Sequence, residues 1–293
     1  MNYATPTRIF ILAMAFGATA GMDSSGDTSS HVAVPVDSSY KLVFDDEFNG
    51  TAIDTDKWNI LSSNTMGGGY GKDLVTPDNA SESGGFLTLL ATQGPASDRP
   101  YRVAFLFTKQ SWAYGYWEGR AKMPANGHGL WPAFWMNHGG TYPEIDILEW
   151  LGNNPKEQWT TYHPVDDAKS TNGVGFGTTV TGPDYSAAFH VYGMWWQPTS
   201  ITWYIDGVQV FQITQGQKFK GTTIDITSTA METILNSAVG GWNKNVVDSS
   251  TVFPTGYLVD YVHIYSNNPN VSAVIPQPGY GGPGDSVGSG DGK

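Results

Sequence analysis

Short strand-like segments recur between about residue 40 and residue 265, separated by the turn-forming residues Gly, Pro, Asn and Asp. The Asp206-Gly207 dipeptide predicts a tight hairpin turn. Only 225–232 could form one short helical turn, and no long amphipathic helix is evident. The pattern therefore predicts an all-β sandwich. The clearest strand candidates are 41–45, 86–92, 101–108, 115–123, 144–150, 158–163 and 200–205.

The composition narrows the classes of function. A chain of 293 residues can form one large domain with a full core. It has no cysteine, which excludes disulfides, thiol catalysis and cysteine-ligated zinc. A net charge of -12 without a long Lys/Arg run disfavours nucleic acid and sulfated polymers as partners. The 11 Trp and 15 Tyr suit the faces of sugars, so a neutral glycan is the expected partner, although acidity could serve solubility alone.

Both ends of the chain differ in composition from the middle. Arg8, the apolar run 9–16 and an Ala-x-Ala pattern at 18–20 predict a signal peptide over 1–20, with a disordered leader as the alternative. The Ser- and Gly-rich segment 21–38 is expected to be disordered. Residues 39–267 would form the domain, and the Gly/Pro-rich segment 268–293 a tail or linker. The expected protein is secreted and extracellular, and no other segment is apolar and long enough for a membrane helix.

Three carboxylates lie close together in the strand candidate 144–150. Glu144 and Asp146 are two residues apart, so in a strand they share a face. Glu149 would face the core in a regular strand, where an unpaired carboxylate is costly. One extra residue near Ile147–Leu148 restores the alternation. The spacing therefore predicts a β-bulge there, which turns Glu149 toward the other two carboxylates.

Crowded carboxylates suit the hydrolysis of a glycosidic bond. Mutual repulsion raises the pKa of some of them, and a glycosidase needs one ionised and one protonated carboxyl group. In a retaining enzyme these two groups lie about 5 Å apart. The same three residues could instead bind calcium or form a solvated acidic strand face.

Aromatic residues and a histidine accompany the carboxylates. Trp131 and Trp135 alternate with apolar residues, so one face of this segment could be core and the other a platform for sugar rings. His163 falls on the next strand candidate, where it would lie beside the carboxylates and tune a pKa or hold a sugar hydroxyl. The alternative for each is an ordinary packed strand residue.

Taken together, these segments resemble glycoside hydrolase family 16. The Glu-x-Asp-x-x-Glu pattern at 144–149 is similar to the bulged form of that family's catalytic strand. The resemblance covers roughly 40–266 in the right order. It also includes 44–49, 113–120, 189–196, 203–207, 235–242 and 258–265.

The resemblance implies a β-jelly-roll sandwich of two antiparallel sheets with a concave substrate cleft. It implies retaining hydrolysis with Glu144 as nucleophile, Glu149 as acid/base and Asp146 assisting the nucleophile. No cofactor for catalysis is expected. A structural calcium on the convex side is implied, and its ligands, largely main-chain carbonyls, would match the backbone near Glu47 and Gly85 together with Asp260.

Within the family, 129–136 and 236–242 look most like laminarinases, the endo-β-1,3-glucanases. Arg102 and Trp242 are also expected to bind substrate, although the segments 71–75 and 101–104, which normally shape the glycone subsites, depart from the laminarinase pattern. Mixed-linkage β-1,3-1,4-glucan and a galactan such as agarose remain alternative substrates. A non-catalytic glucan-binding module is a further alternative, which the three intact carboxylates disfavour. The protein is expected to be a monomer.

Overall fold

The computed structural model describes residues 35–62, 73–95, 99–125, 127–164 and 175–267. The predicted signal peptide, most of the predicted leader, the tail and the glycine-rich segment 67–69 lie outside these ranges. The described residues belong to one compact unit, Val32–Lys293. Within them, no helix is both long enough and apolar enough to cross a membrane.

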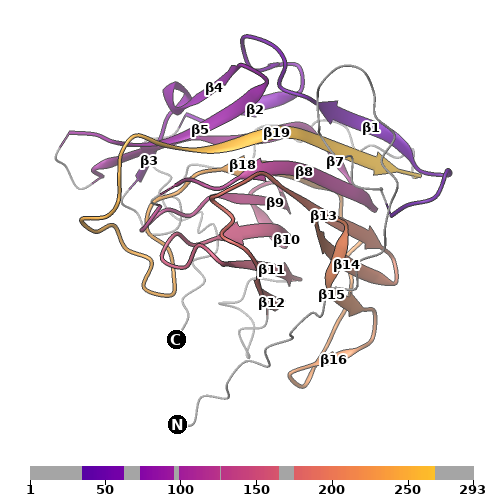
Figure 1. Cartoon of the computed structure of the whole chain (residues 1–293). Coiled ribbons are helices and arrows are strands. Elements are labelled where there is room, and N and C mark those ends of the chain that lie inside the picture. The colour runs from indigo at the N-terminus through magenta and orange to yellow at the C-terminus, as the bar shows by residue number, and fades with distance from the viewer. Residues whose placement is uncertain (1–34, 63–72, 96–98, 126, 165–174, 268–293) are drawn as a thin grey trace, which may run out of the picture. The chain divides into compact units, whose positions relative to one another are not determined.

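Most described residues form two large sheets that pack face to face (Figure 1). The larger has ten strands, and all of its pairs are antiparallel except that of β3 with β6. Its main path runs β15 (Val208–Thr214), β14 (Ser200–Ile205), β13 (His190–Gln197), β8 (Gly115–Lys122), β19 (Thr255–Ser266), β5 (Phe86–Gln93), β6 (Tyr101–Val103) and β3 (Asp73–Val75), while β1 (Lys41–Asp46) pairs with β19 and β4 (Ala80–Ser83) with β5.

The second sheet has seven antiparallel strands and carries the three carboxylates. Its order is β12 (Phe176–Thr181), β11 (Glu157–His163), β10 (Thr141–Trp150), β9 (Ala133–His138), β18 (Met231–Asn236), β7 (Phe105–Trp112) and β2 (Trp58–Ile60). The remaining elements are the small hairpin β16 (Lys218–Phe219) and β17 (Thr222–Thr223) and the 3-10 turn η1 (Pro77–Asn79).

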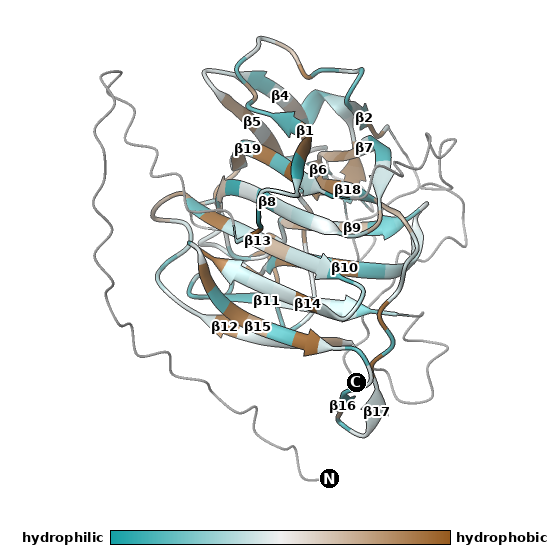
Figure 2. Ribbon diagram, turned by 90° about the vertical axis from the view of Figure 1, so that its right-hand side faces the viewer, coloured by the Kyte–Doolittle hydropathy of each residue, from teal (hydrophilic) through white to brown (hydrophobic). Residues whose placement is uncertain are grey.

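The main core lies between the two large sheets. Strand alternation places the Trp117 ring of β8 in this layer, and its indole N–H donates to Thr233 Oγ1 of β18 at 3.0 Å. At Gly119 a Cβ atom would lie 3.0 Å from the ring of Phe134, so the missing side chain lets the sheets approach closely. Each fully buried large side chain contributes about 1.5–3 kcal/mol by leaving water. Hydrophobic and hydrophilic residues follow one another along the strands, as expected for sheets with one buried face (Figure 2).

Most strand predictions are confirmed, and two need correction. The Asp206-Gly207 hairpin is present, with positive φ at both residues. The candidate 101–108 is two strands, β6 and β7, which belong to different sheets because the chain changes sheet at Ala104. The predicted helical turn at 225–232 is wrong, since 225–230 is irregular and β18 begins at Met231. Ile226 of the irregular segment and Met231 of β18 are both buried, so packing against the rest of the protein accounts for these apolar residues without a helix.

Candidate active site

A β-bulge interrupts β10 between Asp146 and Glu149, as the spacing of the carboxylates predicts. On β11 the residues opposite Glu144, Asp146 and Glu149 are His163, Thr161 and Trp159, which are spaced two apart. Residues spaced two apart share a face of a strand, so the three carboxylates share a face as well. We call this face of the seven-stranded sheet the carboxylate face.

The bulge removes main-chain groups of β10 from the regular ladder, and side chains replace the lost partners. The indole N–H of Trp203, from β14 in the other sheet, donates to the Asp146 carbonyl oxygen at 2.9 Å. The Thr160 hydroxyl on β11 donates to the Ile147 carbonyl oxygen at 2.9 Å. Both donors are buried. The irregular backbone is thus satisfied inside the core, where an unpaired carbonyl would be costly.

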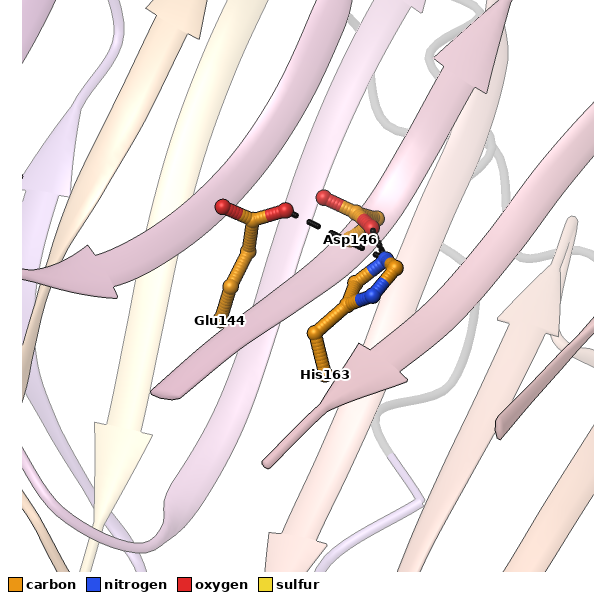
Figure 3. A group of neighbouring side chains, drawn as sticks. All are labelled: Glu144, Asp146 and His163. Atoms are coloured by element: carbon orange, nitrogen blue, oxygen red, sulfur yellow. Dashed lines mark ion pairs between the residues drawn. The ribbon is translucent and has the colours of Figure 1, made fainter. Parts of the chain in front are cut away.

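His163 lies beside two of the carboxylates, as predicted. Its Nε2 atom is 3.2 Å from Asp146 Oδ2 and 4.0 Å from Glu144 Oε1 (Figure 3). Asp146 is buried, whereas Glu144 and His163 are half-buried. The imidazole therefore bridges the inner Asp146 to the more accessible Glu144, and when protonated it would stabilise negative charge on both.

Glu149 has a different environment from the other two carboxylates. The indole N–H of Trp131 donates to Glu149 Oε1 at 3.1 Å, and Trp242 also hydrogen-bonds the carboxylate. Burial, followed by the negative charge of Asp146, raises the pKa of Glu149 to about 8. His163 and the two indole donors act in the opposite direction. Glu149 is thus the carboxyl group of the three whose surroundings favour the protonated form.

Two further polar side chains share the cross-strand row of Glu144. Asn137 on β9 is opposite Glu144, and Glu232 on β18 is opposite Asn137. Both are buried, and Glu232 Oε1 accepts the Gly139 N–H at 2.7 Å. Sequence analysis misses both, because Asn137 carries no charge and Glu232 falls in the segment with a helical pattern. Asn137 and Glu232 come together because β18 pairs with β9 in the sheet.

The expected substrate-binding residues divide into two groups. Trp131, Trp242 and His163 contact the carboxylates. Trp135 is on the carboxylate face opposite Asp146, but it is only 7% exposed and its indole N–H donates to Asn236 Oδ1 at 2.7 Å. Trp135 is therefore a packed residue of this face, and it does not form the expected open platform with Trp131.

Arg102 is not placed with the carboxylates. It lies on β6 in the ten-stranded sheet, and its guanidinium donates to the carbonyl oxygens of Arg99 and Tyr101 at 2.9 and 3.0 Å. The chain changes sheet directly after β6, which keeps Arg102 on the ten-stranded sheet.

The expected calcium stays a prediction, because the main-chain ligands near Glu47 and Gly85 are not tested by the contacts of the side chains there. The Asp260 carboxylate is paired with the guanidinium of Arg120, and the Glu47 carboxylate contacts the His263 ring. Gly85 lies in the turn between β4 and β5 with a φ of 84°. A divalent cation at Asp260 would lie next to the Arg120 charge, which disfavours it.

Within the described ranges, one other group of side chains has the spacing of metal ligands. Oxygen or nitrogen atoms of Glu144, Asp146 and His163 all lie within 4.8 Å of one another. The two carboxylates already lie close to the imidazole, which would supply a positive partner for them when protonated. One carboxyl group with a raised pKa and two further carboxylates on a single sheet face suit acid-assisted cleavage of a glycosidic bond.

Comparison with known proteins agrees with this chemistry. The model of the family described as glycosyl hydrolases family 16 matches residues 71–262. A β-glucanase of Rhodothermus marinus is 30% identical over 282 residues, which cover 87% of this chain and 93% of that protein. The laminarinase structure from Rhodothermus marinus has a TM-score of 0.67 at 30% identity and covers 77% of this chain and 97% of its own.

A second solved structure extends the comparison. SCLam, a non-specific endo-β-1,3(4)-glucanase from family GH16, has a TM-score of 0.69 at 29% identity, covering 80% of this chain and 94% of its own. The likeness to these glucanases and the two-sheet architecture confirm the predicted β-jelly-roll sandwich.

Removing the Thr160 hydroxyl should destabilise the bulge. In Thr160→Val the buried Ile147 carbonyl loses its partner, which should lower the free energy of unfolding by about 1–3 kcal/mol. Thr179→Val on β12 is the matched control, because Thr179 is exposed and should change stability by less than about 0.5 kcal/mol. Urea denaturation measures both. Equal stability of the two variants would show that the Thr160 hydroxyl does not support the bulge.

Proposed function

The chain belongs to glycosyl hydrolases family 16, and on this premise we propose that it hydrolyses internal β-1,3 linkages of a glucan, including mixed β-1,3-1,4-glucan, by a retaining double displacement. The single observation that carries the proposal is the bulge in β10, which puts Glu144, Asp146 and Glu149 on one face. A module that only binds glycans has no need of a neutral buried carboxyl group beside two other carboxylates.

The first step requires a nucleophile and an acid. The Glu144 carboxylate attacks the anomeric carbon, while Glu149 gives its proton to the glycosidic oxygen as that bond breaks. The raised pKa of Glu149 supports its role as the acid, because the carboxyl group must hold a proton before the step begins. The product is a glycosyl ester on Glu144 and a released sugar with a free hydroxyl.

The second step returns the enzyme to its starting state. The ionised Glu149 now takes a proton from water, which attacks the anomeric carbon and releases Glu144 as a carboxylate. Two inversions at the anomeric carbon retain its configuration. Asp146 and His163 would orient Glu144 throughout, since Nε2 of the imidazole is 3.2 Å from Asp146 Oδ2 and 4.0 Å from Glu144 Oε1.

The proposed substrate is a neutral β-glucan. The protein's net charge of -12 repels sulfated or carboxylated polymers and leaves a neutral one unaffected. Trp131 and Trp242 beside Glu149 offer aromatic surface to sugar rings. The similar proteins from Rhodothermus marinus and the SCLam enzyme are named as glucanases, which supports the same substrate class here.

Incubation with laminarin and barley β-glucan tests the proposed function. New reducing ends should form on at least one of them, and NMR at early times should show the β-anomer first. Glu144→Gln removes the nucleophile and should lower turnover more than about 1,000-fold. Turnover of agarose alone would replace the glucan proposal by a galactan, and initial α-anomer would refute retention.

The raised pKa of Glu149 predicts a pH limit for the reaction. The acid form is populated below a pH of about 8 and lost above it, so kcat/KM on laminarin should fall on the alkaline side with an apparent pKa near 8.

The raised pKa of Glu149 also affects the stability of the fold. The stability that neutral Glu149 contributes is complete below its pKa in the unfolded chain and is lost as the pH rises through its pKa in the folded protein. Glu149→Gln should abolish that pH-dependent loss of stability between roughly pH 4.5 and 8. Identical pH–stability curves for the two proteins would contradict the raised pKa.

We also propose that the protein is exported by its N-terminal segment. The apolar run 9–16 followed by Ala18-Thr19-Ala20 supports cleavage after Ala20. N-terminal sequencing of the protein recovered from the culture medium of a producing cell should therefore begin at Gly21. Recovery of an uncleaved chain from inside the cell would contradict export.

A further inference from the structure

Two tryptophan side chains meet at Glu149, and their role extends beyond contact with sugar. We propose that Trp131 and Trp242 are positioning residues whose indole N–H groups hold the Glu149 carboxyl group in the orientation for proton transfer. This inference deepens the proposed function and rests on Glu149 being the acid/base. The Trp131 N–H donates to Glu149 Oε1 at 3.1 Å, and the Trp242 side chain makes a second hydrogen bond to the carboxylate.

The chemistry of indole makes this contact directional. An indole nitrogen only donates a hydrogen bond, so the oxygen that Trp131 binds must be an acceptor. In the neutral carboxyl group the carbonyl oxygen is the better acceptor, so the hydrogen bond to Oε1 favours the proton on Oε2. A solvated carboxyl group would rotate among several orientations, and fixing one of them favours the transfer geometry.

The indole donors also oppose the effect of burial on Glu149. A hydrogen bond to the ionised form stabilises it and lowers the pKa, whereas burial and the Asp146 charge raise it. The titratable groups that act on Glu149 are Asp146 on its own strand and His163 on β11. At the register positions directly beside Glu149, β11 and β9 present Trp159 and Ala133, which do not titrate. The two indoles thus keep Glu149 able to act as a base in the second step.

The main chain that carries Trp131 is fixed to the segment that leads to Trp242. The Trp131 N–H donates to the Ala238 carbonyl oxygen at 2.9 Å, and the Ala238 N–H donates back to the Trp131 carbonyl oxygen at 3.0 Å. The neighbouring residues Leu130 and Val239 form an isolated antiparallel bridge. The main chain at Trp131 is therefore held against the segment that leads to Trp242.

One buried amide ties both segments to the end of β10. Asn245 is fully buried, and its Nδ2 donates to the carbonyl oxygens of Leu130 and Gly240 at 2.8 and 2.6 Å. Its Oδ1 accepts the N–H groups of Gly129 and Asn153 at 3.0 and 3.1 Å. Every polar position of the amide is used, which fixes its orientation and that of the three segments around it. We call this arrangement the Asn245 clamp.

The clamp leaves no room for adjustment around Trp131. Gly129 has a φ of 78°, and a Cβ atom there would lie 2.4 Å from the Val247 nitrogen. Such close backbone packing is unnecessary for a ring that serves only as an adaptable sugar platform. It is what a hydrogen bond of fixed direction requires.

Direct titration of Glu149 in phenylalanine variants tests the inference. Trp131→Phe and Trp242→Phe keep an aromatic ring and remove the N–H donor. Carbon-13 NMR of glutamate-labelled protein, with Glu149→Gln to assign the signal, measures the pKa of Glu149 without reference to activity. Each variant should raise this pKa by about 0.5–1 unit, because the ionised form loses a donor. The alkaline limb of kcat/KM should move up by the same amount, and kcat should fall more than KM rises.

Trp135→Phe is the matched control, because its indole N–H donates to Asn236 and makes no described contact with Glu149. It should leave the pKa of Glu149 unchanged. The inference is overturned if Trp131→Phe and Trp242→Phe also leave this pKa unchanged. If the pKa rises while the limb of kcat/KM stays in place, the hydrogen bonds are real and the assignment of Glu149 as the acid fails. Circular dichroism checks that each variant is folded. If one of the two tryptophan variants fails to fold, the other still tests the inference.

Discussion

The active face depends on how two backbone carbonyl groups of β10 are satisfied. At the bulge, the carbonyl oxygens of Asp146 and Ile147 accept hydrogen bonds from side chains. The indole N–H of Trp203 donates to the first and the hydroxyl of Thr160 to the second. Without those donors, the buried backbone would favour a regular strand and would turn Glu149 into the core. The arrangement of all three carboxylates therefore follows from hydrogen bonds made on the opposite side of the strand.

The two sheets have unequal roles in this arrangement. The seven-stranded sheet presents the carboxylates, while the ten-stranded sheet supports them through the core. Trp203 is the direct link, since it belongs to the ten-stranded sheet and its indole N–H donates to a backbone carbonyl of β10. A sandwich packed by apolar contacts alone could slide by fractions of an ångström, whereas a directional hydrogen bond between the layers opposes such movement.

Local pattern was enough to predict the strands, the Asp206-Gly207 hairpin and the bulge, because each depends on residues close together in the chain. Glu144 and Asp146 are an even number of residues apart and Glu149 is an odd number from Glu144, so one extra residue in the strand was needed to put all three on one face. The partners that stabilise the bulge could not be predicted, because Trp203 is 57 residues from Asp146. Similarly, the polar row through Asn137 and Glu232 depends on sheet order, which spacing along the chain does not encode.

Errors in the predicted site have the same origin. Arg102 was expected to bind substrate, but the change of sheet at Ala104 keeps it on the ten-stranded sheet. Trp135 lies on the predicted face but is almost fully buried, because neighbours such as Phe105 from β7 cover its ring. The face of a sheet on which a residue lies can be inferred from its spacing along the strand. Its exposure cannot, because exposure depends on the side chains of other strands.

The Asn245 clamp has a consequence for protein engineering. Three segments, around Leu130, Asn153 and Gly240, share one amide, so a loop exchanged with that of a related enzyme would leave orphaned hydrogen-bonding groups in the other two. Chimeras in this region should be designed by transplanting all three segments and the asparagine together. Diversification of single loops is better directed to parts of the sandwich where no shared residue constrains the neighbours.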